Sequence, residues 1–164
     1  MKSLAFQAKA LAGLRYDGGM SRYRKGPHTA YELHYHFVFI TKYRKPILRG
    51  EIALRLRDLI REICGSHDVQ IVKGHVRPDH VHLMLSMPPQ VSPSRIMQAV
   101  KGKSSHHLVR EYHRLQREFW GRHLWARGYF ACTTGNVTDE VIKQYIELQG
   151  EAPESDDEEF RVSE

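Results

Sequence analysis

The chain has 164 residues, of which 41% are hydrophobic, and its formal net charge is +6. This length is enough for one hydrophobic core, so we expect a single domain. The sequence has no run of about eighteen apolar residues, which a membrane span needs, and its first residues lack the ordered regions of a secretory signal. A cytoplasmic protein without a membrane segment is therefore expected. Cys64 and Cys132 are far apart and have no CxxC partner, which favours buried free thiols.

The charge is divided unevenly along the chain. Residues 151–164 hold seven acids and one base, which leaves 24 bases against 12 acids, a net charge of +12, in the preceding residues. A body this basic indicates a polyanionic partner, and nucleic acid is the leading candidate. Tyrosines interleave with basic residues at 22–24 and again at 42–45, which supports the same interpretation.

Three regions follow from this composition and from the pattern of apolar residues. Glycine and proline interrupt residues 1–30 without a sustained period, so we interpret them as an extension that is poorly ordered at its start. Residues 31–150 carry the patterned sequence, and residues 151–164 form an acidic tail that is predicted to be disordered. Because the pattern begins well after Met1, Met20 is an alternative start.

Residues 33–41 are rich in aromatic and β-branched side chains. Tyr35, Phe37 and Phe39 fall on one face and His34, His36 and Val38 on the other, which predicts a strand. Apolar residues then recur at helical spacing from Ile52 to Ile63, and Gly65 provides a stop. This second segment is predicted to be a helix.

A hairpin and a long helix are predicted next. Two short apolar runs, 69–76 and 80–87, are separated by Arg77-Pro78-Asp79, a turn composition expected between antiparallel strands. Ser92 supplies a capping hydroxyl, and Pro93 suits the first position of a helix that should run to about residue 117 with a bend at Gly102.

The last two predicted elements complete the fold. Residues 125–133 are predicted to form a strand, and Thr138 can cap a helix whose first turn carries Asp139 and Glu140. The order βαββαβα predicts an α+β protein. Its fold would be a ferredoxin-like or RNA-recognition-like antiparallel sheet with helices packed on it.

Two pairs of residues carry candidate chemistry. The period of a strand places His80 and His82 on one face, and two adjacent imidazoles can bind one cation. Tyr145 and Gln149 lie four residues apart and therefore share one face of the last helix. Each pattern alone is common in structural positions, because the chain has 11 histidines and tyrosines often pack in the core.

Several motifs occur together in the order of one known family. They are His80-Val81-His82, Lys101-Gly102-Lys103-Ser104-Ser105, Arg127-Gly128-Tyr129-Phe130, Tyr145-Ile146-Glu147-Leu148-Gln149 and the segment at 34–44. Through them, about residues 31–149 resemble the single-tyrosine HUH transposases of the TnpA type from the smallest bacterial insertion sequences, whose relatives include the REP-associated tyrosine transposases.

The resemblance implies a function and a set of site residues. Residues 31–150 would be a catalytic domain that cuts and rejoins single-stranded DNA, with hairpins at the element ends, through a 5′-phosphotyrosine intermediate. Tyr145 would be the nucleophile, and His80, His82 and Gln149 would bind the metal. This neutral ligand set suits Mg²⁺ or Mn²⁺. The family also implies a homodimer with shared active sites, and no nucleotide cofactor is expected.

Further residues are candidates for DNA contact. They are Arg44, Lys45, Lys101, Lys103, Arg127 and Tyr129, the last by stacking on an unpaired base. The segment 101–105 resembles the end of a phosphate-binding loop, but it lacks the preceding glycine and lies in a helical pattern, so no such loop is predicted. The remaining histidines, His36 and His75 among them, are interpreted as structural.

Three alternatives fit parts of the sequence. A single-stranded nucleic-acid-binding module would carry aromatic residues where His80 and His82 lie. A zinc hydrolase would need a further histidine, cysteine or paired carboxylate nearby, and the sequence does not indicate one. A domesticated relative acting on chromosomal repeats would use the same chemistry as the transposase.

Overall fold

The computed structural model describes residues 23–119, 123–133 and 139–150, and it divides the chain into two compact units, residues 1–32 and 33–164. The acidic tail, Met20 and the predicted cap Thr138 lie outside the described residues. Within the described part of the chain, no helix has the length and apolar character needed to cross a membrane.

The first unit contains a short hairpin. Strands β1 (Arg24–Lys25) and β2 (Ala30–Tyr31) pair in antiparallel fashion, and the amide of Gly26 donates to the carbonyl of Thr29 at 2.7 Å. The guanidinium of Arg24 lies 5.2 Å from the centre of the Tyr31 ring. The predicted extension therefore includes a two-stranded sheet that periodicity did not indicate, because each strand has only two residues.

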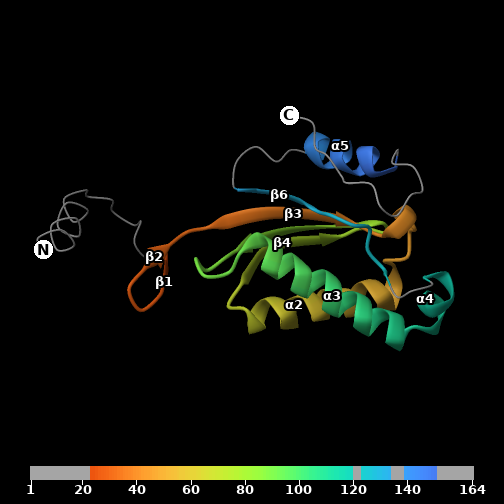
Figure 1. Ribbon diagram of the computed structural model, residues 1–164, viewed down its shortest axis with the longest axis horizontal. Helices are drawn as coiled ribbons and strands as arrows, with labels where there is room; N and C mark the ends of the chain where they lie inside the picture. The colour runs from red at the N-terminus through yellow and green to blue at the C-terminus, as the bar shows by residue number, and fades with distance from the viewer. Residues whose placement is uncertain (1–22, 120–122, 134–138, 151–164) are drawn as a thin grey trace, which may run out of the picture. The chain divides into compact units, whose positions relative to one another are not determined.

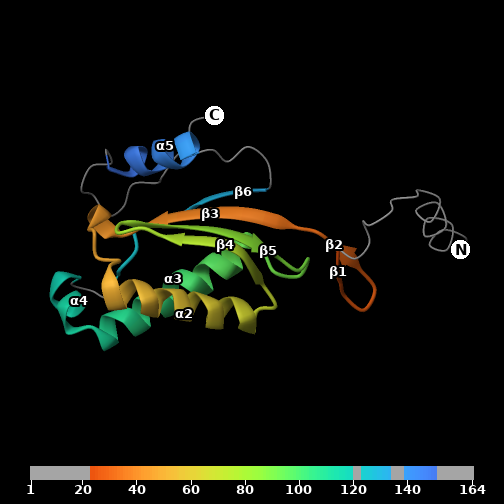
Figure 2. The same ribbon diagram turned by 180° about the vertical axis from the view of Figure 1, so that it is seen from behind.

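The second unit is built on a four-stranded antiparallel sheet with the order β4-β5-β3-β6. The strands are β3 (His34–Ile40), β4 (Gln70–Val76), β5 (His80–Ser86) and β6 (Phe130–Thr133). Helices α2 (Gly50–Ser66) and α3 (Pro93–Glu111) cover one face, and α5 (Asp139–Gly150) lies on the other, as both ribbon views show (Figures 1 and 2). The predicted α+β ferredoxin-like arrangement is confirmed.

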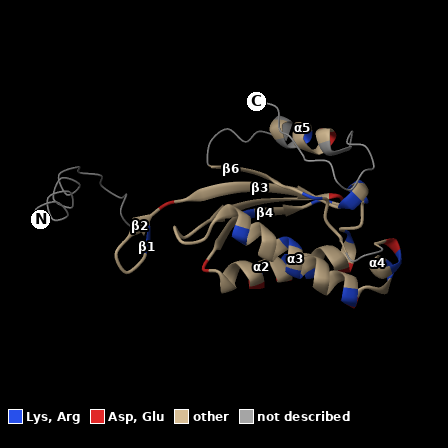
Figure 3. Ribbon diagram, viewed as in Figure 1, with Lys and Arg blue, Asp and Glu red and all other residues tan. Residues whose placement is uncertain are grey.

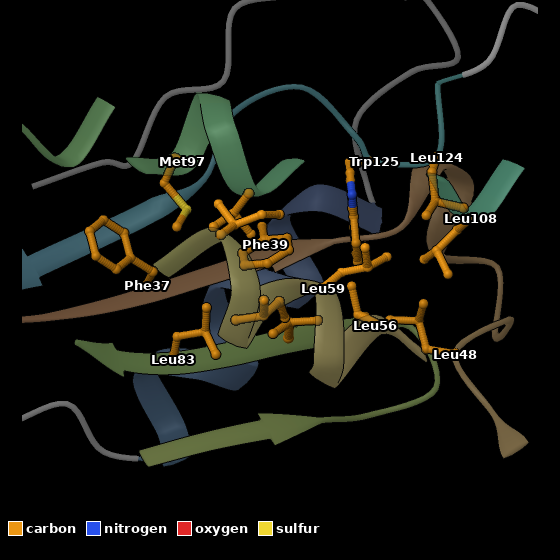
Figure 4. Packing of buried hydrophobic residues seen from close by; sticks show 14 of the residues in the cluster. Phe37, Phe39, Leu48, Leu56, Leu59, Leu83, Met97, Leu108, Leu124 and Trp125 are labelled. Atoms are coloured by element: carbon orange, nitrogen blue, oxygen red, sulfur yellow. The ribbon is translucent and has the colours of Figure 1, made fainter. Parts of the chain in front are cut away.

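The main core lies between the sheet and helices α2 and α3. The alternation predicted for the first strand is present, because Phe37 and Phe39 are fully buried on the helix side (Figure 4). Val81, Leu83 and Leu85 of β5 point to the same side. Val38 and Ile40 are also buried, on the opposite face, because α5 covers them. The end of β3 is thus enclosed from both sides.

The long helix ends differently from the prediction. Gly102 lies within an uninterrupted α3, and the break falls at Tyr112, whose φ of −114° and ψ of 102° are extended. A second short helix, α4 (His113–Glu118), follows. The Tyr112 hydroxyl donates to the carbonyl of Glu51 at 3.3 Å, a contact with α2 that no local sequence signal reveals. The predicted bend at Gly102 was therefore wrong.

The predicted fourth strand is shorter than expected. Trp125 forms an isolated bridge with Thr41, and β6 begins only at Phe130. Between them, Gly128 has a φ of +79°, a conformation that glycine adopts readily but that interrupts extended pairing.

Side chains of α3 hold this segment in place. Ser105 Oγ accepts from the Leu124 amide at 3.1 Å, and Ser104 Oγ accepts from the Trp125 indole at 2.9 Å. Lys101 Nζ donates to the carbonyls of Ala126 at 2.8 Å and Gly128 at 2.6 Å. Burial lowers the pKa of Lys101 to about 8, so the ammonium is still protonated at neutral pH. These residues of the 101–105 motif therefore position the chain that leads into β6.

We predict that Lys101→Met lowers the free energy of unfolding by about 2 kcal/mol, because hydrogen bonds from a charged donor contribute about 1.5–3 kcal/mol. Urea unfolding followed by circular dichroism measures the change. Lys103→Met, two residues along the same helix at an exposed position, should leave the free energy within about 0.5 kcal/mol of the parent value. Equal effects of the two substitutions would contradict a structural role for Lys101.

Candidate active site

The paired histidines lie on the face of the sheet that α5 covers. His80 and His82 are half-buried, whereas the intervening Val81 is fully buried on the opposite face. Strand pairing sets His80 opposite Ile40 and His82 opposite Val38, and cross-strand partners share a face. The predicted placement of both imidazoles on one face is therefore present.

Asp79 fixes the ring of His80. Its Oδ1 lies 2.8 Å from His80 Nδ1, and its Oδ2 lies 3.4 Å from a guanidinium nitrogen of Arg44. Burial alone would raise the pKa of Asp79, but the hydrogen bonds and positive charges of His80 and Arg44 outweigh it and hold the pKa below its ordinary value. The ionised carboxylate can only accept a hydrogen bond, so the neutral form of His80 carries its proton on Nδ1. The lone pair of its Nε2 is then available for a metal, as in many carboxylate–histidine–metal sites.

Two further histidines surround His82. His36 Nδ1 lies 3.2 Å from His82 Nε2. His75 of β4 is the cross-strand partner of His82 of β5, and the centroids of their rings are 6.4 Å apart. Burial and, to a smaller extent, the charge of His34 lower the pKa of His36, which favours its neutral form. The sequence interpretation treated His36 and His75 as structural and found no third histidine near the pair. Strand register brings both of them there, although His36 lies 46 residues from His82 in sequence.

Tyr145 packs on the same face of the sheet as the histidines. Its ring lies against Phe130, with centroids 5.8 Å apart, and it clusters with Val38, Ile40 and Ile146. Because Val38 is also the cross-strand partner of His82, the tyrosine and the histidine pair share this face. Tyr145 is only 3% exposed and its hydroxyl oxygen is buried. Burial raises the pKa of this phenol above its ordinary value.

The available donor set fits part of a metal site. The side chain of Gln149 lies outside what the structure describes, so its role as third ligand stays a prediction. Among the described residues, no group of three or more His, Cys, Asp or Glu side chains is arranged to hold a metal. Of the two proposed imidazole ligands, His80 has a carboxylate partner, Asp79, that fixes its ring.

The proposed DNA-contact residues do not form one surface. Arg44 lies beside Asp79, and Lys45 Nζ lies 5.4 Å from the centre of the Phe119 ring. Lys101 is directed to backbone carbonyls, and Tyr129 packs against Phe37 with ring centroids 6.3 Å apart. Lys103 is exposed on α3, which covers the face of the sheet opposite to the histidines. Arg127 is also exposed. Basic residues occur both at the end of β3 and along α3 (Figure 3). Their contacts with DNA stay predictions.

Comparison with known proteins places the chain in a class of enzyme that transfers DNA strands. Residues 29–149 match the family described as "Transposase IS200 like". The chain belongs to this family, and it is accordingly an insertion-sequence transposase.

Individual relatives agree with this assignment. The chain is 36% identical over 126 residues to the ISDra2 transposase TnpA of Deinococcus radiodurans, a match that covers 77% of this chain and 90% of the relative. It is 35% identical over 122 residues to the transposase for insertion sequence element IS200 of Salmonella typhimurium, covering 74% and 80%. A 1.90 Å crystal structure of a Deinococcus radiodurans protein assigned as a transposase superimposes with a TM-score of 0.72 at 36% identity, covering 79% of this chain and 99% of the other.

We predict that Asp79 determines the tautomer of His80. At about pH 8, where an ordinary imidazole is neutral, long-range ¹H–¹⁵N NMR of the metal-free protein should show the proton of His80 on Nδ1. Asp79→Ala should remove this preference, while Asp58→Ala, which removes an exposed carboxylate of α2 paired with Arg61, should preserve it. A proton on Nε2 in the parent protein would contradict the assignment.

Proposed function

We propose that the protein cuts and rejoins single-stranded DNA through covalent attack by Tyr145, with His80, His82 and Gln149 as metal ligands. The observation that supports this most is the position of Tyr145 and the histidine pair on one face of the sheet, joined through Val38. In the proposed step, the Tyr145 oxygen forms a bond to phosphorus and loses its proton. The bond to the 3′ oxygen breaks, which leaves a 5′-phosphotyrosine and a free 3′-hydroxyl.

A tyrosine nucleophile suits strand transfer better than activated water. The phosphotyrosine bond retains the energy of the phosphodiester, so a 3′-hydroxyl can reverse the step without ATP. When bound, Mg²⁺ or Mn²⁺ would supply positive charge to the scissile phosphate and to the leaving oxygen. On the protein side, Asp79 would keep His80 in the tautomer that presents Nε2.

The buried state of Tyr145 implies that α5 moves before the reaction. A hydroxyl oxygen enclosed between helix and sheet cannot reach a DNA phosphate, and its raised pKa makes it a weak nucleophile in that environment. We infer that α5 leaves its contacts with Val38, Ile40 and Phe130 when DNA binds. Docked α5 is then the resting state of the protein. After α5 is released, Tyr145 can approach a pair formed by His80 and His82.

The proposed substrate is single-stranded DNA of the insertion-sequence ends, including terminal hairpins, and the proposed setting is the cytoplasm. The net charge of +12 before the acidic residues 151–164 supports binding to a polyanion. The proposed assembly is a homodimer in which α5 of each chain delivers Tyr145 to the histidines of the other. A helix that has to undock can bind the equivalent face of a second copy with the same contacts.

A domesticated relative that acts on chromosomal repeats remains the second candidate function. It would use the same residues and the same covalent step, so the DNA flanking the gene distinguishes it from a mobile element. A binding module without catalysis is disfavoured because the chain belongs to a transposase family.

We predict that Tyr145→Phe abolishes the covalent adduct with labelled single-stranded DNA while DNA affinity stays within about threefold, because only the nucleophilic oxygen is removed. Denaturing gel electrophoresis detects the adduct, and fluorescence anisotropy measures the affinity. Tyr112→Phe provides a matched control, since that hydroxyl contacts Glu51 at the far end of α3. An adduct that persists in Tyr145→Phe would refute the assignment of the nucleophile.

A mixing experiment tests whether the sites are shared between subunits. One chain carries His80→Ala and His82→Ala, and the other, with a different affinity tag, carries Tyr145→Phe. With shared sites, each heterodimer contains one intact site and one site with both defects, so cleavage should return to about half of the parent level.

If each site is built within one chain, both sites of every heterodimer are defective. Purified heterodimers should then be as inactive as the two parent variants. That result would refute sharing between subunits and leave the role of Tyr145 unchanged.

A further inference from the structure

We propose that Tyr43 is a stacking platform for an unpaired base of the DNA strand, held next to the histidine site by a strained turn. This inference rests on the proposed single-stranded substrate. The turn follows β3 directly and includes the short 3-10 helix η1 (Lys42–Arg44). Its basic residues are visible at the end of β3 (Figure 3).

The backbone of this turn is unusual for the residues that it contains. Tyr43 has a φ of 58° and a ψ of 20°, and Arg44 also has a positive φ, of 50°. The left-handed region is unfavourable for bulky side chains and costs about 1–3 kcal/mol per residue. A turn that served only to reverse the chain would favour glycine or asparagine at such positions. A tyrosine here is therefore better explained by what its ring does.

Hydrogen bonds from several parts of the fold hold the turn. The Thr41 amide donates to the carbonyl of Asp79 at 3.0 Å, and Thr41 Oγ1 donates to the carbonyl of Lys45 at 2.8 Å. The Lys42 amide donates to the carbonyl of Leu124 at 2.8 Å. Because neighbouring segments determine its shape, the turn can keep a strained residue in one orientation.

The resulting orientation places the Tyr43 ring in solvent. Tyr43 is 60% exposed, the highest value among the exposed large hydrophobic residues in the described part of the chain. Lys42 Nζ lies 5.3 Å from the ring centre, where an ammonium can also meet a phosphate. An exposed aromatic ring accompanied by cations is the usual arrangement for binding a single strand, with the base on the ring and the backbone on the charges.

The turn is also connected to the proposed metal ligands. Arg44 contacts the Asp79 carboxylate, which hydrogen-bonds to His80. A base stacked on Tyr43 would therefore keep the neighbouring phosphates close to the histidine face. The occupant that this geometry favours is an unpaired base, because the stacking face of a paired base is covered within the duplex.

Three variants test the proposal in the Tyr145→Phe background, which prevents cleavage. Tyr43→Asn removes the ring but suits the left-handed backbone, so folding should be retained. Tyr43→Phe keeps the ring and loses only the hydroxyl. Leu54→Asn is the control, because Leu54 is a large hydrophobic residue that is 58% exposed on α2 and does not belong to the turn. Thermal unfolding monitors the fold of each protein.

The probe is a single-stranded oligonucleotide of the element end, with 2-aminopurine at one position after another. Stacking contributes about 1–3 kcal/mol per base, so Tyr43→Asn should weaken binding by about 5- to 140-fold, while Tyr43→Phe and Leu54→Asn change it by less than about twofold. At one position, the quenched 2-aminopurine fluorescence of the complex should recover in Tyr43→Asn only.

Unchanged affinity in Tyr43→Asn, or an equal loss in Leu54→Asn, would overturn the role of Tyr43. Failure of the parent protein to bind or to form an adduct would instead count against the proposed function. The two failures are therefore distinguishable in the same set of measurements.

Discussion

The site depends on the antiparallel pairing of β3 with β5. Seven consecutive pairs, from His34 with Ser86 to Ile40 with His80, fix which side chains of the two strands meet. A shift by one residue would turn every side chain to the opposite face and would bury the imidazoles among the apolar residues of α2 and α3. The alternation of β5 prevents this shift, because Val81, Leu83 and Leu85 are fully enclosed in the main core.

The opposite face of the same strand pair combines two requirements that conflict. In the proposed reaction its histidines need access to a phosphate, whereas Val38 and Ile40 need cover from water, and α5 provides that cover with Tyr145 and Ile146. The contacts that stabilise the docked helix therefore also bury Tyr145, the proposed nucleophile. Undocking a helix from an apolar cluster this small costs a free energy that DNA binding can offset. Separating α2 and α3 from the larger core on the other face would cost too much for DNA binding to offset.

The sequence predicted the parts of the structure that depend on local pattern. The alternation of β5 indicated that His80 and His82 share a face, and Ser92 caps α3 as expected, accepting from the Arg95 amide at 3.2 Å. Contacts between distant segments were not predictable in the same way. The proximity of His36 to His82 depends on strand register, and the role of Lys101 depends on where the segment after α4 runs. The structure shows Tyr145 on the face of the sheet that carries His80 and His82. The proposed role of Gln149 depends on the sequence motif alone.

Asp79 links the two halves of the proposed DNA-binding machinery. Its carboxylate accepts from His80 and Arg44, and its backbone carbonyl accepts from the amide of Thr41. One residue immediately before β5 therefore orients a proposed metal ligand and anchors the turn that exposes Tyr43. Since its pKa lies below the ordinary value, the carboxylate stays ionised at neutral pH and can serve both neighbours as an acceptor. The proposed metal ligand His80 and the turn that carries Tyr43 thus both contact the Asp79 carboxylate, the turn through Arg44.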